Sequence, residues 1–149
     1  MNRPSWDEYF KRVTQETAKR SNCIKRQVGS VLVKNNRIIG VGYNGTPKGF
    51  PNCYQGGCER CITQHQAKSN NQQYTRTTQN CMCMHAELNA ILSANTESLQ
   101  GSTIYSTLEP CLECAKVITQ VGISRVVYAQ ANNGVSRGLI IEMYKSCNI

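Results

Sequence analysis

The chain has 149 residues, of which 40% are hydrophobic, and its formal net charge is +8. This length predicts a single domain over residues 1–149 and excludes two ordinary domains. No apolar run approaches the roughly 18 residues of a membrane span, and the N-terminal residues lack a signal-peptide pattern, so no membrane partner and a cytoplasmic, intracellular location are expected.

The first part of the chain predicts a helix and a β-hairpin. Apolar residues at three- and four-residue spacing indicate an amphipathic helix from Trp6 to Arg20. Ser5 is its expected N-cap, and Glu8 stands three residues later, as in a capping box. Two β-rich runs, Val28 to Val33 and Ile38 to Tyr43, flank a short polar turn and predict a hairpin.

A polar, cysteine-rich insert follows, at about residues 44–83. It has little hydrophobic periodicity, so we expect a long loop that something must hold in place. The whole chain has nine cysteines, an odd number, and no export signal is recognised. Metal binding by reduced thiols is therefore favoured over disulfides. Residues 63–80 are rich in Gln, Asn and Thr and indicate no function.

The second part alternates helices and strands. A helix is expected to open at His85 and end near Asn95. The later elements are expected to be a strand over Thr103–Ser106, a helix from Pro110 through Val121, a strand over Arg125–Ala129 and a helix over Gly134–Cys147. This alternation predicts a parallel pair of strands in a mixed sheet covered by helices.

The most informative pattern is His85-Ala86-Glu87 followed by Pro110-Cys111-Leu112-Glu113-Cys114, with 22 residues between the two motifs. One His and two Cys supply three zinc ligands and leave the fourth position for water, which is the layout of a catalytic site. Both motifs open helices, and the helix dipoles favour thiolates beside the metal. Zinc lowers the pKa of bound water, and Glu87 is placed to move the protons.

Each of these residues also has a structural interpretation. His85 can cap a helix, the cysteine pair can be buried thiols or half of a structural zinc site, and Glu87 can complement a helix dipole. Glu109 and Glu113 flank the cysteine pair and are alternative bases, although we expect both at the surface.

The two motifs together have the pattern of zinc-dependent nucleobase deaminases. The runs 20–29, 42–47, 52–61 and 81–87 extend the match, so that most of residues 6–130 resembles the cytidine/deoxycytidylate deaminase superfamily and, within it, the deoxycytidylate (dCMP) deaminases. The resemblance implies a three-layer α/β/α sandwich with a five-stranded mixed sheet. It implies zinc-dependent hydrolysis of dCMP to dUMP and ammonia, which feeds thymidylate synthesis. It further implies a homo-oligomer, often a hexamer, that dCTP activates and dTTP inhibits, with Mg²⁺ accompanying these triphosphates.

The resemblance also assigns further site residues. Arg26, Asn44 and Gly45 are similar to nucleotide-holding positions. Some relatives have a second, structural zinc, and the positions similar to its ligands are Cys23, Cys53, Cys83 and Cys61, with Cys58 and Cys81 as alternates. His65 could replace one of these cysteines, and Cys147 is expected to be a bystander. A closed four-ligand site would explain how the polar insert stays ordered.

Other functions remain open. A deaminase that acts also or mainly on dCTP or dCDP would differ only in its phosphate pocket, whose residues the sequence does not identify and which a neighbouring subunit could supply. A base deaminase of tRNA or single-stranded nucleic acid fits the net charge of +8, but basic and aromatic residues do not interleave as a stacking groove requires, so nucleic acid is not expected. The intact His85, Glu87, Cys111 and Cys114 disfavour a catalytically inactive zinc module.

Overall fold

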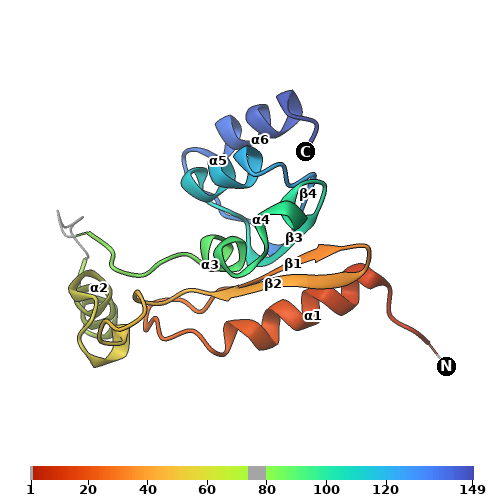
Figure 1. Cartoon of the computed structure of the whole chain (residues 1–149). Helices are drawn as coiled ribbons and strands as arrows, with labels where there is room; N and C mark the ends of the chain where they lie inside the picture. The colour runs from red at the N-terminus through yellow and green to blue at the C-terminus, as the bar shows by residue number, and fades with distance from the viewer. Residues whose placement is uncertain (1, 74–79) are drawn as a thin grey trace.

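The computed structural model describes residues 2–73 and 80–149 (Figure 1). Its elements, in chain order, are α1 (Trp6–Ala18), β1 (Gly29–Lys34), β2 (Arg37–Tyr43), η1 (Cys53–Gln55), α2 (Glu59–Ser69), α3 (Ala86–Ser93), α4 (Thr96–Leu99), β3 (Thr103–Leu108), α5 (Leu112–Gln120), β4 (Arg125–Gln130) and α6 (Arg137–Ser146). Within the described ranges, the helices are too short or too polar to cross a membrane.

The strands form one mixed sheet in the order β2-β1-β3-β4. β1 is antiparallel to β2 and to β3, whereas β3 and β4 are parallel. The predicted hairpin and the predicted parallel pair are therefore confirmed. The expectation of five strands is wrong for the described chain, because residues 131–136 leave β4 as irregular chain and turn and lead directly into α6.

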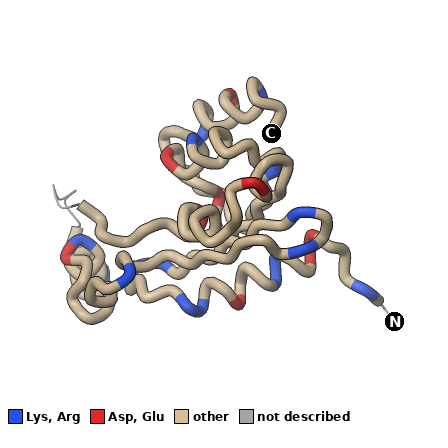
Figure 2. Tube along the Cα trace, viewed as in Figure 1, with Lys and Arg blue, Asp and Glu red and all other residues tan. Residues whose placement is uncertain are grey.

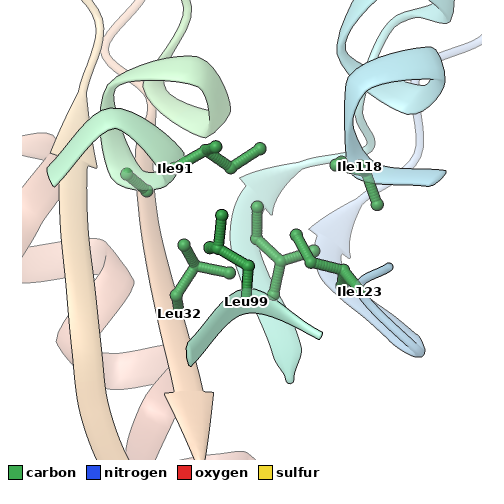
Figure 3. Close-up of a cluster of buried hydrophobic side chains, with 7 residues drawn as sticks. Leu32, Ile91, Leu99, Ile118 and Ile123 are labelled. Carbon is green, nitrogen blue, oxygen red and sulfur yellow. The ribbon is translucent and has the colours of Figure 1, made fainter. Parts of the chain in front are cut away.

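Helices cover both faces of the sheet, as the sandwich expectation requires. On one face, Phe10 of α1 packs against Val31, Val33 and Tyr105. On the other face, β1 and β3 pack against the helices that follow the insert, through a cluster of Leu32, Ala90, Ile91, Leu99, Ile104, Ile118 and Ile123 (Figure 3). Successive residues of β1 thus serve opposite layers, because side chains alternate across a strand.

Local sequence signals account for the start of α1. Ser5 Oγ accepts a hydrogen bond of 3.2 Å from the Glu8 amide, and the Glu8 carboxylate accepts one of 2.7 Å from the Ser5 amide. This reciprocal pair is the predicted capping box. The helix ends at Ala18, two residues before the predicted end.

The insert is not the predicted long loop, because it contains η1 and α2. Cys61 is the one buried residue of α2, so this helix has no apolar stripe from which its period could be read. The short helix α4 was also not predicted. Of residues 63–80, the first seven complete α2, and residues 74–79 lie outside the described chain.

Candidate metal-dependent active site

Two helix N-termini bring the proposed zinc ligands together. His85 is the N-cap of α3, Cys111 is the N-cap of α5, and Cys114 lies in the first turn of α5. His85 Nδ1 is 3.4 Å from Cys111 Sγ and 3.3 Å from Cys114 Sγ. A tetrahedral zinc with ordinary bond lengths separates its nitrogen and sulfur ligands by about 3.6 Å. The donor set and its spacing therefore fit one zinc ion.

The electrostatics of this group favour negative charge on sulfur. Hydrogen bonds from Cys114 and then from His85 lower the pKa of Cys111 to about 3. The pKa of Cys114 is raised, because its thiol bonds to Cys111 and is buried. The pKa of His85 is raised chiefly by its hydrogen bond with Cys111. A thiolate and two converging positive helix ends are the environment in which a thiophilic cation binds.

Glu87 stands beside this ligand group in the first turn of α3. Its side chain is only 4% exposed, and burial raises the pKa of its carboxyl group. It lines a cavity of about 230 Å³ together with His85 and Cys111. A buried carboxyl group with a raised pKa, adjacent to metal ligands, is suited to accept and return protons near neutral pH.

Another part of the cavity wall is formed by Lys25, Arg26, Val28 and Asn44. Lys25 and Arg26 are exposed at its edge. Figure 2 shows Lys and Arg at both ends of the β1–β2 hairpin and along α1, so the positive charge of the first third of the chain is spread over the length of the molecule. Lys25 and Arg26 are the part of this charge that lies at the cavity.

Asn44 holds the segment that forms this wall. Its side-chain oxygen accepts hydrogen bonds from the Val28 amide at 2.8 Å and from Ser21 Oγ at 2.6 Å, and its amide nitrogen donates to the Arg26 carbonyl at 2.8 Å. Its side chain therefore fixes residues 21–28 against the start of the insert. A contact between Asn44 and a nucleotide stays a prediction.

Gly45 connects this wall to the metal ligands. Its amide donates to the Met84 carbonyl at 3.2 Å, and the Met84 amide donates back at 2.8 Å, next to His85. A Cβ at Gly45 would lie 2.8 Å from the Asn22 side chain, so glycine permits this close approach. A direct role for Gly45 in nucleotide binding likewise stays a prediction.

The surface position expected for Glu109 is wrong, whereas that expected for Glu113 is confirmed. Glu109 is 4% exposed, and its carboxylate accepts hydrogen bonds from the Asn132 amide at 2.8 Å and from Arg137 Nε at 3.1 Å. Arg137 comes from α6, so no local pattern indicated this pairing. Glu113 is exposed and pairs with Lys116 at 2.8 Å. Because the Glu109 oxygens are already engaged, Glu87 is the better candidate for proton transfer.

Six further cysteines gather beside the same cavity. Each of two groups of four has all its sulfur atoms within 4.8 Å of one another: Cys23, Cys53, Cys61 and Cys83; and Cys58, Cys61, Cys81 and Cys83. The first group is the set predicted for a second metal, and the structure brings its four members together. His65 belongs to neither group, and Cys147 is exposed at the end of α6.

Comparisons with known proteins agree with the pattern at this site. The family model for the "Cytidine and deoxycytidylate deaminase zinc-binding region" matches residues 4–130. The chain is 46% identical to the deoxycytidylate deaminase of Saccharomyces cerevisiae over 87% of its own length but only 39% of that protein. It is 42% identical to the deoxycytidylate deaminase of Mycobacterium phage D29 over 86% of this chain and 97% of the phage protein.

A solved structure extends the similarity to three dimensions. The dCMP deaminase from the cyanophage S-TIM5, in complex with dCMP and dUMP, superimposes with a TM-score of 0.74 at 28% identity. The match covers 100% of this chain and 96% of the cyanophage chain.

Proposed function

Because the chain belongs to the cytidine and deoxycytidylate deaminase family, we propose that it is a zinc-dependent enzyme that hydrolyses dCMP to dUMP and ammonia. The observation that carries this proposal is the convergence of His85, Cys111 and Cys114 next to a cavity that His85, Cys111 and the buried Glu87 line. Support for the substrate comes from the phage D29 relative, of similar length, and from the cyanophage protein solved with dCMP and dUMP.

The ligand residues and Glu87 divide the chemistry between them. His85, Cys111 and Cys114 would hold the zinc ion, and the bound metal would supply a water of lowered pKa, suited to attack C4 of the pyrimidine at neutral pH. Glu87 accepts the two protons of the water in turn and delivers one to ring N3 and one to the leaving amino group. C4 gains the oxygen and becomes a carbonyl, while the amino group departs as ammonia. Burial of Glu87 favours its protonated form and therefore its role as donor.

The basic edge of the cavity is suited to the substrate phosphate. Lys25 and Arg26 are exposed there, and both can donate hydrogen bonds to phosphate oxygens. We assign the phosphate to this edge, with residues of a second copy of the chain as a further source of contacts. Acceptance of dCDP or dCTP would require the same edge to accommodate a longer anion.

The proposal has finer parts that rest on the family resemblance. These are activation by dCTP and inhibition by dTTP, each accompanied by Mg²⁺, assembly into a homohexamer and a role in supplying thymidylate precursors. A second, structural zinc is proposed at Cys23, Cys53, Cys61 and Cys83, and the proximity of these four sulfur atoms supports it.

Product chromatography with dCMP, dCDP, dCTP, deoxycytidine and cytidine tests the activity, with dCTP or dTTP added as effector. We expect turnover of dCMP, raised by dCTP and lowered by dTTP. Glu87→Gln should lose about 10²–10⁴-fold or more of this activity while retaining its zinc, whereas Glu113→Gln, at an exposed acid, should remain active. A folded, zinc-containing protein that turns over none of these nucleotides would refute the proposal.

A further inference from the structure

The two groups of cysteines overlap in a way that one metal ion does not explain. Cys61 and Cys83 belong to both groups of four. A single zinc bound by Cys23, Cys53 and the shared pair leaves Cys58 and Cys81 as free thiols. Yet Cys58 is fully buried, and its sulfur is 3.9 Å from that of Cys81. Two cysteines thus remain without a function although they are as closely placed as the other four.

Each group contains sulfur–sulfur distances that match the edges of a metal–thiolate tetrahedron. With a Zn–S bond of about 2.3 Å, a regular tetrahedron has S···S edges of about 3.8 Å. In the first group, Cys23 and Cys61 are 3.8 Å apart. In the second group, the edges from Cys81 to Cys58 and from Cys81 to Cys61 are both 3.9 Å. A disulfide would instead require about 2.0 Å between sulfur atoms.

The insert has little else to hold it together. Its buried cluster consists of five of these cysteines, with Ile24 packed against it as a partly buried hydrophobic residue. In Figure 1, α2 lies beyond the end of the β1–β2 hairpin that is away from the hairpin turn, and Cys61 is its buried residue. Sulfur atoms alone are a poor hydrophobic core for a helix of 11 residues, whereas metal–thiolate bonds can supply the missing folding free energy.

We propose that the six cysteines hold a binuclear zinc–thiolate cluster in which Cys61 and Cys83 bridge the two ions. Cys23 and Cys53 complete the tetrahedron of one ion, and Cys58 and Cys81 complete that of the other. Cys58 and Cys81 are therefore simultaneous ligands rather than alternates. The inference goes beyond the proposed deamination and a single structural zinc, since it assigns a third metal position to the chain.

The charges and hydrogen bonds around the cluster are compatible with this assignment. Six thiols lose their protons on binding, so two Zn²⁺ and six thiolates have a net charge of −2. Two separate zinc sites with four thiolates each would together have a charge of −4, so sharing two thiolates halves the buried charge. The Met82 amide donates to Cys58 Sγ at 3.4 Å, the kind of outer bond that supports metal-bound thiolates. Lys25 and Arg26 stand two and three residues after Cys23 and add positive charge to the same segment of chain.

Metal analysis by native mass spectrometry, combined with elemental analysis, tests the cluster in the wild-type protein. We expect three zinc ions per chain, one in the catalytic site and two in the cluster. Cys81→Ala should contain two, because the sulfur removed is an exposed ligand of only one ion. Cys147→Ser, at an exposed cysteine outside the cluster, should keep three. His85→Ala should lose the catalytic ion and retain the cluster.

Cadmium-113 NMR tests the bridges themselves. After exchange of zinc for ¹¹³Cd, two all-thiolate resonances should split each other, since scalar coupling between the ions passes through shared sulfur atoms. Two zinc ions in the wild-type protein, with Cys58 and Cys81 open to alkylation or joined in a disulfide, would overturn the proposal. Uncoupled cadmium resonances or iron in place of zinc would also overturn it. None of these readouts depends on turnover, so the proposed deamination can fail independently.

Discussion

At Gly42, strand β2 approaches helix α3 closely, and this approach sets the position of the candidate active site relative to the sheet. A Cβ at this residue of β2 would lie 2.2 Å from the Ala90 amide nitrogen and 2.3 Å from the Ala86 carbonyl oxygen. Both atoms belong to the backbone of α3, the helix that begins after His85 and contains Glu87. Gly42→Ala must therefore separate the strand and the helix.

The required displacement follows from these distances. An ordinary contact of a Cβ begins near 3.4 Å, so the two backbones must move apart by about 1 Å. Such a movement strains the hydrogen bonds that join them, from Asn89 Nδ2 to the Tyr43 carbonyl at 2.8 Å and from the Val41 amide to Ser93 Oγ at 2.9 Å. Overpacking of this kind costs about 1–3 kcal/mol, or a fall in Tm of about 3–10 °C for a chain of this size.

The same displacement should lower activity beyond the loss of stability. A shift of about 1 Å in a positioned catalytic group can reduce the rate about 10²-fold. Measured well below its Tm, Gly42→Ala should therefore lose kcat with dCMP, while thermal denaturation records the destabilisation. Gly138→Ala is the matched control, because a Cβ there meets open space in α6, and it should match or slightly exceed the wild-type stability. A Gly42→Ala protein with unchanged Tm and kcat would refute the reasoning.

Three further predictions concern stability, substrate binding and pH. Ile118→Ala should lower the free energy of unfolding by about 2–5 kcal/mol in urea denaturation, because Ile118 is fully buried, whereas Lys116→Ala on the same helix should cost less than about 0.5 kcal/mol. Asn44→Ala should raise KM for dCMP more than it lowers kcat in steady-state assays, because three hydrogen bonds that hold the cavity wall are lost. Equal effects on KM and kcat would contradict the role of Asn44 in positioning that wall. The Arg125 guanidinium lowers the pKa of Asp7, so stability from this pair should be lost as pH falls below about 4. Between pH 5 and 3.5, the free energy of unfolding measured in urea should fall slightly more for the wild type than for Asp7→Asn. The difference should be less than about 1 kcal/mol because the pair is partly exposed, and an equal fall in the two proteins would contradict it.

Local patterns were sufficient to predict the elements that present the candidate zinc ligands. The positions of His85, Cys111 and Cys114 along the chain form a recognisable pattern without any knowledge of the fold. The residues around each motif also indicate where the two helices start. Apolar periodicity likewise revealed α1, the hairpin and the strand–helix alternation. It did not reveal α2, because a helix that buries a cysteine rather than an apolar stripe has no hydrophobic period.

Contacts between distant residues had to come from the tertiary structure. Glu109 is buried because Arg137, 28 residues later, pairs with it, and the sheet has four strands in the described chain because α6 follows β4. The sequence by itself identified the ligand types of the candidate active site, since each of its two short motifs can be read along the chain. Only the tertiary structure decided that Cys61 and Cys83 are shared by two groups of thiols, because that sharing depends on the packing of three segments that no local interaction brings together.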